Sequence, residues 1–377
     1  MRSHFPAFAV WQLVETVPLL LCVIGCDDAA TPARALDAGT DAGPALAPTV
    51  IFEDRADGYP VFRIPALLET PRGTLLAFAE GRQSLQDDGN VDLVLRRSTD
   101  GGRSWDALRV VVDAGADTAG NPAPVVDRSN GRIWLPYCTN PATAMQQRSV
   151  WVTYSDDDGV TWSAPRDITS SVKPTDWTWY ATGPGRSVQT ASGRIVVPCD
   201  HTDGAGVGRA HVIFSDDHGA TWQRGGDASP GTDESQVAEL DDGTLLLASR
   251  DEGPALARAF SRSTDQGLHW SDAVLVPSLP DPHCEGSLLR APSGLWMSNP
   301  ATRTVLPRDH LTVRRSDDDG ATWTHARLVE AGPSAYSSLA VLPDGRIALA
   351  WESGRVLPYD RIRFVSFEPA WVLGADP

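Results

Sequence analysis

Short runs in which apolar and polar residues alternate recur along this chain, and each leads into a polar turn. Two examples are the run from Val150 to Tyr154 and the run from His211 to Phe214. Period-two runs bounded by turn residues are typical of β-strands. Both runs end at the same eight-residue phrase, Ser-x-Asp-x-Gly-x-(Thr/Ser/His)-Trp. The phrase occurs five times, at Ser98–Trp105, Ser155–Trp162, Ser215–Trp222, Ser263–Trp270 and Ser316–Trp323.

The residue types of this phrase predict a β-hairpin turn. The Asp side chain can accept hydrogen bonds from backbone amides of its own turn. The Gly two residues later adopts a positive φ without a Cβ clash. The Trp returns the chain to an apolar layer, where its ring can fill a gap between sheets.

A second repeat predicts the architecture. The copies of the phrase are 57, 60, 48 and 53 residues apart, and a period near fifty with strands in each unit is typical of β-propellers. A Gly followed by an apolar strand occurs six times, at Gly73, Gly131, Gly193, Gly243, Gly294 and Gly345. Six such strands and five turns predict an all-β fold, a six-bladed β-propeller whose last blade lacks the turn phrase. A closed ring leaves only short sheet edges.

Composition narrows the possible partners. One propeller, assigned to residues 49–377, uses nearly all of the 377 residues. The formal net charge of −17 disfavours nucleic acid and anionic membrane surfaces, although a few arginines in a cleft can bind a small anion. The sequence has no Cys/His cluster with metal-ligand spacing and no Gly-rich phosphate loop, so we predict neither metal nor cofactor. A monomer is expected.

The N-terminal segment is expected to direct export. Residues 1–25 hold an apolar run, Val17 to Gly25, that is too short to span a bilayer. The run ends in Val23-Ile24-Gly25-Cys26, which resembles a bacterial lipoprotein signal whose Cys becomes the lipidated first residue; a plain secretory or uncleaved signal is the alternative. Residues 26–48, rich in Ala, Asp, Pro and Gly, are predicted to be a flexible tether. We expect an exported protein that meets the membrane only through a lipid anchor at the cell envelope, or is otherwise secreted.

Three cysteines remain after this segment, and an odd number leaves at least one unpaired. They are Cys138, Cys199 and Cys284. Cys138 and Cys199 lie near the ends of equivalent strands of neighbouring blades, which leaves a disulfide between them open. We predict buried free thiols instead.

Charged residues follow four of the six Gly-led strands at equivalent positions. Seven residues past each Gly stand Glu80, Cys138, Asp200, Arg250, Ala301 and Glu352, and Arg82 follows the first of them. We interpret these as the innermost strands, whose ends meet at one mouth of the propeller. The charged residues would then face a shared pocket, and structural salt bridges at the mouth are the alternative.

One further phrase carries a family resemblance. Tyr59-Pro-Val-Phe-Arg63-Ile-Pro-Ala, together with the repeated turns, resembles the sialidases (exo-α-sialidases, neuraminidases), in which an Arg-Ile-Pro signature accompanies such turns, called Asp boxes. The similarity runs from about Val50 to the C-terminus. It implies a six-bladed propeller that removes terminal sialic acids from sialylated glycans by a retaining mechanism with a tyrosyl-enzyme intermediate.

The resemblance implies that three arginines bind the substrate carboxylate. They are Arg63, Arg250 and Arg308, and Arg303 is the alternative for the third. Arginine suits this task because its planar fork donates two hydrogen bonds to a carboxylate and keeps its charge. Glu352 corresponds to the carboxylate that holds Arg63 in place before substrate arrives.

The resemblance also implies the catalytic residues. Tyr336 corresponds to the nucleophile, because a neutral phenol is not repelled by the carboxylate on the anomeric carbon of sialic acid. Glu234 corresponds to the base that takes the phenol proton, with Glu239 as a competitor. Asp87 corresponds to the general acid/base on a loop over the mouth, and its neighbour Asp88 is the alternative.

The remaining positions are less specific. Arg82 corresponds to an arginine that points toward the ring substituents or toward the loop that carries the general acid. Asn121-Pro122, Trp177 to Thr182 and Asp200-His201 are expected to form the rest of the wall.

Three other functions compete with hydrolysis. A trans-sialidase would share the core site but usually needs an aromatic acceptor platform, which we do not locate. A non-catalytic sugar-binding propeller would have no need for Tyr336, Glu234 and Asp87 together. A protein-binding scaffold would not explain the arginines.

Overall fold

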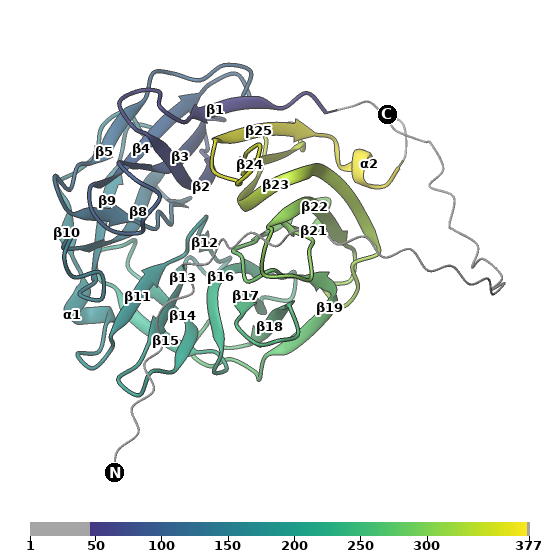
Figure 1. The fold of residues 1–377 in the computed structure, drawn as a ribbon. Coiled ribbons are helices and arrows are strands. Elements are labelled where there is room, and N and C mark those ends of the chain that lie inside the picture. Colours follow the sequence, from purple (N-terminus) through teal and green to yellow (C-terminus); the bar gives the residue numbers. More distant parts are fainter. Residues whose placement is uncertain (1–45, 375–377) are drawn as a thin grey trace, which may run out of the picture. The chain divides into compact units, whose positions relative to one another are not determined.

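Residues 46–374 of the computed structural model can be described, and they are built almost wholly of β-strands (Figure 1). The two short helices are α1 (Thr169–Val172) and α2 (Pro369–Val372). The predicted signal at residues 1–25 and most of the predicted tether, residues 26–45, lie outside the described part of the chain. Within the described part, no helix is both long enough and apolar enough to cross a membrane.

The first sheet has nine strands in the order β10-β9-β8-β6-β4-β3-β2, with β5 on β4 and β7 on β8. Its pairs are antiparallel apart from a single parallel contact between β4 and β6. The strands are β2 (Val61–Glu69), β3 (Leu75–Arg82), β4 (Val91–Ser98), β5 (Arg109–Val112), β6 (Thr118–Gly120), β7 (Val125–Asp127), β8 (Arg132–Asn140), β9 (Ser149–Ser155) and β10 (Arg166–Asp167).

Two smaller sheets follow in the chain. The five-stranded sheet has the order β11-β13-β14-β15 with β12 on β13, and the four-stranded sheet has the order β16-β17-β18-β19. Their strands are β11 (Trp179–Thr182), β12 (Val188–Gln189), β13 (Ile195–Thr202), β14 (Gly208–Ser215), β15 (Gln223–Asp227), β16 (Thr232–Glu239), β17 (Leu245–Asp251), β18 (Ala257–Ser263) and β19 (Val274–Pro280).

The last sheet joins the two ends of the described chain. Its order is β1-β25-β24-β23-β22-β21-β20, so the first strand pairs with the last (Figure 1). Its strands are β1 (Thr49–Glu53), β20 (Ser287–Ala291), β21 (Gly294–Pro300), β22 (Asp309–Ser316), β23 (His325–Val341), β24 (Ile347–Ser353) and β25 (Arg361–Phe367). The 17-residue β23 pairs with β22 along its first half and with β24 along its second.

The hydrophobic core lies between neighbouring sheets. One cluster packs Phe62 and Leu75 from the start of the chain against Phe364 from its end. Another packs Trp134 of β8 against Ile195 of β13. Each fully buried large apolar side chain stabilises the fold by about 1.5–3 kcal/mol. The layers between sheets therefore hold the whole arrangement together.

The repeated phrase forms the turn that its residues predict. In the second copy, Ser155 Oγ donates to Asp157 Oδ1 at 2.8 Å, and the Asp157 carboxylate accepts from Thr161 N at 2.8 Å. Gly159 has a φ of 78°. The tryptophans of the five copies are buried or half-buried against the sheets.

The six Gly-led strands are all present, but their predicted place was wrong. They form β3, β8, β13, β17, β21 and β24, and each lies between two neighbouring strands. The strands nearest the centre in Figure 1 are instead their predecessors, among them β2, β16 and β23. The Gly lies in the hairpin between the two, as Gly73 does with a φ of 80° while Thr70 N donates to Thr74 O. Because the Gly-led strand follows this hairpin, it is the second strand of the hairpin and lies farther from the centre than the strand before it.

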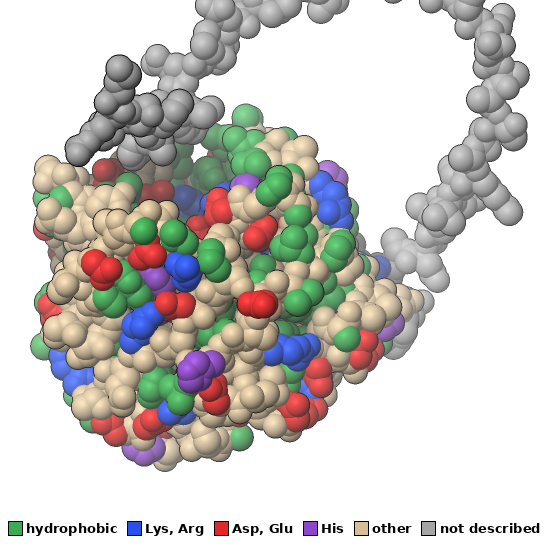
Figure 2. Space-filling view, turned by 90° about the horizontal axis from the view of Figure 1, so that it is seen from below, with side chains coloured by type: hydrophobic (Ala, Val, Ile, Leu, Met, Phe, Trp, Pro, Cys, Tyr) green, Lys and Arg blue, Asp and Glu red, His purple; other side chains and the backbone are tan. Residues whose placement is uncertain are grey.

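The state of the three cysteines agrees with the prediction, and the surface mixes charged and apolar side chains. Cys138, Cys199 and Cys284 are buried free thiols, as predicted. Figure 2 shows one side of the molecule, where acidic and basic side chains are interspersed with apolar ones.

Candidate active site

Three central strands break register next to the predicted site residues. In each, the strand advances three residues while its partner advances two, between Arg63 and Ala66 in β2, Thr232 and Ser235 in β16, and Ser334 and Ser337 in β23. Such β-bulges kink a strand and redirect its side chains. The backbone of Ile64, inside the first bulge, has a φ of 58°, which is unusual for a β-branched residue. The bulges thus turn side chains out of the regular alternation.

Two of these bulges bring a phenol and a carboxylate together. Tyr336 Oη donates to Glu234 Oε1 at 2.5 Å, although the residues are 102 positions apart. Tyr336 is buried. Burial raises its pKa well above the usual value, and the charge of Glu234 adds to this effect while Arg250 and Arg308 oppose it. The phenol is therefore neutral and hydrogen-bonded to a potential base, and Glu239 lies elsewhere, bonded to Ala191 N.

Three arginines surround this pair. Arg250 Nη1 donates to Glu234 Oε2 at 3.1 Å. The guanidinium carbons of Arg63 and Arg308 lie 5.2 and 5.8 Å from the centre of the Tyr336 ring. Arg308 is half-buried, whereas Arg303 is exposed and donates to the carbonyl of Pro277. The geometry therefore gathers Arg308, not Arg303, with the other two.

Glu352 fixes the first of these arginines. Arg63 Nε and Nη2 donate to the two carboxylate oxygens of Glu352 at 3.0 and 3.3 Å. The same carboxylate accepts the backbone N–H groups of Ile64 at 2.9 Å and Tyr336 at 3.3 Å. The Glu352 side chain is fully buried and that of Arg63 is 9% exposed. One buried carboxylate thus connects the bulges of β2 and β23.

Asp87 lies on an exposed loop beside two arginines. Arg82 Nη1 donates to Asp87 Oδ1 at 2.7 Å, and Arg63 Nη1 lies 3.7 Å from the same oxygen. The Asp87 side chain is 60% exposed. Partial burial raises the pKa of its carboxyl group, but the charges of Arg82 and Arg63 lower that pKa by more. The pKa of Asp87 therefore lies below its usual value. Arg82 is itself buried and bonded to Glu80 at 2.7 Å.

These residues line one small pocket of about 80 Å³. Its lining residues are Arg63, Ile64, Glu80, Arg82, Asp87, Thr118, Asn121, Arg148, Trp179, Glu234 and Tyr336. Asp87 belongs to this lining, unlike its neighbour Asp88. Of the predicted site residues, three are not among the lining residues but contact them: Arg250 contacts Glu234, Arg308 contacts Tyr336 and Glu352 contacts Arg63.

Arg148 also lines the pocket and was not predicted from the sequence. Its guanidinium carbon lies 3.9 Å from the Trp179 ring, and its Nη1 donates to Asn121 Oδ1 at 2.6 Å. Trp179 Nε1 in turn donates to Asp200 Oδ2 at 2.7 Å. Arg148 stands at the start of a strand with no motif around it, so nothing in the sequence distinguished it from the surface arginines.

Part of the predicted wall lies elsewhere. Trp177 and His201 do not line the pocket; their rings stack on each other with centroids 3.4 Å apart inside a buried aromatic cluster. Alternation along β13 explains the separation, since successive side chains of a strand point to opposite faces. Asp200 therefore reaches the pocket side while His201 faces the core.

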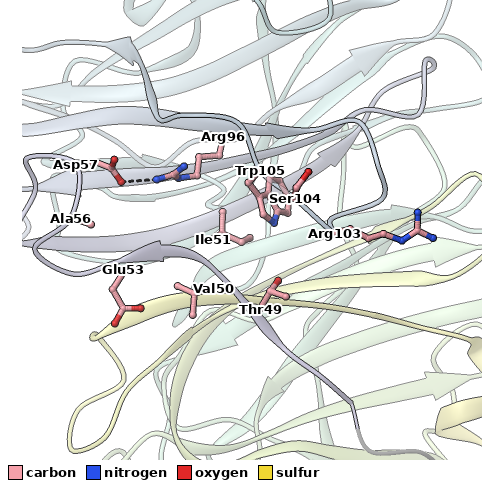
Figure 3. Close-up of a pocket in the computed structure, with 10 residues that line it drawn as sticks. All are labelled: Thr49, Val50, Ile51, Glu53, Ala56, Asp57, Arg96, Arg103, Ser104 and Trp105. Carbon is pink, nitrogen blue, oxygen red and sulfur yellow. Dashed lines mark hydrogen bonds and ion pairs between the residues drawn. The ribbon is translucent and has the colours of Figure 1, made fainter.

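A second pocket is lined by residues of the first strand and the first turn phrase (Figure 3). Asp57 and Arg96 form an ion pair of 2.6 Å at its edge, and the Arg103 side chain points away from them (Figure 3). Its lining is Thr49, Val50, Ile51, Glu53, Ala56, Asp57, Arg96, Arg103, Ser104 and Trp105. This lining offers no phenol paired with a base, and it has no counterpart of the clustered arginines around Tyr336.

An all-β fold whose central strands present a phenol, a carboxylate and clustered arginines defines a candidate glycosidase of acidic sugars. Residues 73–349 match the family model for the BNR repeat-like domain. The chain is 35% identical to a sialidase of Micromonospora viridifaciens, over 92% of this chain and 58% of that protein. It is 33% identical to an exo-alpha-sialidase of Aspergillus fumigatus, over 78% of this chain and 79% of that protein. The chain belongs to the sialidase family.

Solved structures agree on the fold. A Hadza microbial sialidase, Hz136, is 29% identical and superposes with a TM-score of 0.79 over 86% of this chain and 68% of that one. A leech intramolecular trans-sialidase is 18% identical, with a TM-score of 0.75 over 87% and 71% of the two chains. The chain spans about three fifths of the length of two bacterial sialidases that it matches.

Proposed function

We propose that this protein is a retaining exo-α-sialidase that hydrolyses terminal sialic acids of glycoconjugates. The observation that carries the proposal is the 2.5 Å contact between Tyr336 and Glu234 inside a group of three arginines. Family membership supports the same substrate class. In this proposal Arg63, Arg250 and Arg308 bind the substrate carboxylate, because each offers a permanent charge and paired N–H donors.

The first half-reaction forms a tyrosyl-enzyme. The Tyr336 oxygen attacks the anomeric carbon while Glu234 takes the phenol proton. The bond between the anomeric carbon and the leaving oxygen breaks, and Asp87 protonates that oxygen. A phenol suits this attack because the anomeric carbon carries a carboxylate, which would repel an anionic nucleophile.

The second half-reaction releases sialic acid. A water molecule attacks the anomeric carbon while Asp87 takes one of its protons. The bond to the Tyr336 oxygen breaks, and Glu234 returns the proton to the phenolate. Two displacements at the same carbon give net retention of configuration.

The ionised Asp87 of the ligand-free site is compatible with its role as an acid. Its low pKa results from Arg82 and Arg63, which outweigh partial burial. A substrate carboxylate bound by Arg63 brings a new negative charge close to Asp87 and competes for the same guanidinium. Both effects favour the protonated carboxyl. We therefore propose that substrate binding itself raises the proton affinity of Asp87.

The finer architecture and the location belong to the same proposal. Each of the two larger sheets is consistent with two four-stranded units, because β23 pairs with different strands along its two halves and β4 touches β6 at one residue. This division would make six blades over residues 49–377.

Export by the segment 1–25, with lipidation at Cys26 and a tether at 26–48, would place the enzyme at the cell envelope.

The direct test is turnover of an aryl α-sialoside, with and without lactose as an acceptor. Hydrolysis with a free sialic acid product and no sialyl-lactose supports the proposal. Sialyl-lactose as the main product indicates a transferase instead. Tight binding of sialic acid without turnover indicates a sugar-binding propeller.

A further inference from the structure

A second buried glutamate lies behind Tyr336, and the mechanism above does not use it. Glu285 stands just before β20 and is 2% exposed. Its Oε2 accepts the backbone N–H of Ser337 at 3.1 Å, the residue that follows Tyr336. Its Oε1 is buried and has no hydrogen-bond partner among the described residues. Glu285 thus contacts the β23 bulge from the segment before β20, whereas Glu352 contacts it from β24.

The two glutamates bind the same bulge in different ways. Glu352 accepts the N–H of Tyr336 and forms an ion pair with Arg63. Glu285 accepts the next N–H along the strand, and within residues 46–374 it has no cationic side chain within ion-pair distance. The nearby Arg258 is already paired with Asp281 at 3.0 Å. Together the two carboxyl groups hold the N–H groups that the bulge withdraws from regular strand pairing.

The environment of Glu285 disfavours a charge. Burial raises its pKa well above the usual value, and the carboxylates of Glu234 and Glu352 raise it further; the Ser337 N–H and Arg258 oppose this shift. A neutral carboxyl still accepts a hydrogen bond through its carbonyl oxygen. A neutral group also adds no negative charge behind the base Glu234.

We propose that Glu285 is a positioning residue: its carboxyl group accepts the N–H of Ser337 and so holds the β23 bulge where the Tyr336 phenol meets Glu234. The proposal rests on the proposed function, because it assigns Glu285 a role in aiming the nucleophile. It predicts that an uncharged acceptor of the same shape replaces Glu285 and that an apolar side chain does not.

Two substitutions and one control test this inference in the full chain. Glu285→Gln keeps an acceptor for Ser337 N and should retain kcat within about twofold, with an unchanged pH profile. Glu285→Leu keeps the volume but removes the acceptor, and should lower kcat by about 10- to 100-fold, the scale expected for a shift near 1 Å at a reacting group. KM should change less, because the arginines are held by other residues.

Ser287→Ala is the matched control. Ser287 Oγ accepts the N–H of Leu339 at 3.0 Å, so it joins the same two strands two residues farther from the nucleophile. Its loss should lower the melting temperature without a comparable loss of kcat. An equal loss of kcat in Ser287→Ala and Glu285→Leu would show a general effect of strand contacts and overturn the proposal.

Crystal structures of the variants give a readout that does not depend on activity. The distance between Tyr336 Oη and Glu234 should stay near its present value in Glu285→Gln and lengthen in Glu285→Leu. An unchanged distance and kcat in Glu285→Leu, or a large loss or a shifted pH profile in Glu285→Gln, would refute the positioning role. Wild-type protein that turns over no sialoside would instead refute the proposed function, whatever the distances show.

Discussion

In both the repeated turns and the site of this protein, carboxyl groups accept backbone N–H groups that have no partner in strand pairing. The two regions differ in how far apart in the sequence the donor and the acceptor lie. In a turn such as Ser155–Trp162, one carboxylate accepts N–H groups at most four residues away. In the site, Glu352 and Glu285 accept N–H groups from other strands, 16 to 288 residues away. The turns are complete within eight residues, whereas the site exists only in the folded chain.

The carboxyl groups of the turns and of the site also differ in how easily they ionise. The turn carboxylates are close to solvent, and their hydrogen bonds lower their pKa values, to about 2 for Asp157. The buried Glu285 has no such access, and its pKa is raised. The turn carboxylates therefore stabilise the fold through their charge, whereas Glu352 is paired with Arg63 and burial favours the protonated form of Glu285. Substitutions at the turns should consequently affect stability alone. Substitutions in the site should affect catalysis, and they should also affect stability where a buried charge loses its partner.

The largest expected effect lies at the pair of Tyr336 and Glu234. Tyr336→Phe and Glu234→Gln should each lower kcat on a natural sialoside by on the order of 10⁴-fold or more, as when one member of a catalytic unit is removed. The double variant should be little worse than either single one, because the two act together. Sialic acid should still bind Tyr336→Phe, measured by calorimetry, since the arginines remain. Independent, multiplicative losses in the double variant would argue against a unit.

A smaller but global effect is expected from Glu352→Gln. Ile64 N and Tyr336 N donate to different oxygens of Glu352, so the amide oxygen of Gln can accept only one of them. The substitution also removes the buried charge that pairs with Arg63 and leaves only the exposed Asp87, 3.7 Å away. An uncompensated buried charge typically costs about 3–5 kcal/mol, so urea unfolding should show a loss of this size together with a raised KM. A loss below about 1 kcal/mol would mean that Arg63 finds another counter-charge, with Asp87 the nearest candidate.

The pH dependence of kcat/KM and of kcat should show that Asp87 has a lower pKa in the free enzyme than in the substrate complex. A general acid must be protonated, so activity falls as pH rises through its pKa. The pKa of Asp87 is lowered by Arg82 and Arg63 in the free enzyme, and we expect substrate to raise it. The basic limb of kcat should therefore lie at higher pH than that of kcat/KM. If kcat and kcat/KM fell at the same pH, substrate binding would not raise the pKa of Asp87. Arg82→Met should move the limb of kcat/KM to higher pH.

The smallest effect is expected at a turn. Asp157→Ala removes an acceptor of several hydrogen bonds and should cost about 1–2 kcal/mol of stability, the scale of one or two net hydrogen bonds. Because the folded pKa is depressed to about 2, the wild-type advantage is full above about pH 4. It disappears as pH falls toward 2. Activity below the melting temperature should not change, and an altered KM would contradict the separation of turns from site.

The sequence predicted the features that are local or that carry a motif. The turn phrase specified its own hydrogen bonds, and the Arg-Ile-Pro phrase led to Arg63 and, through the family, to the residues that gather around Tyr336. Arg148 and Glu285 could not be found, because their roles depend on contacts between distant strands. The Gly-led strands were placed one strand too far inward, since periodicity shows that a strand exists but not which neighbour covers it.

The central claim is that Tyr336 attacks the anomeric carbon with Glu234 as its base. A fluorinated sialosyl donor, whose electron-withdrawing fluorine slows breakdown of the intermediate, should accumulate a covalent adduct. Peptide mapping by mass spectrometry should find the sialyl mass on the peptide that contains Tyr336, and Tyr336→Phe should carry none. An adduct on Glu234 or Asp87, or rapid turnover of the donor by Tyr336→Phe, would contradict the account.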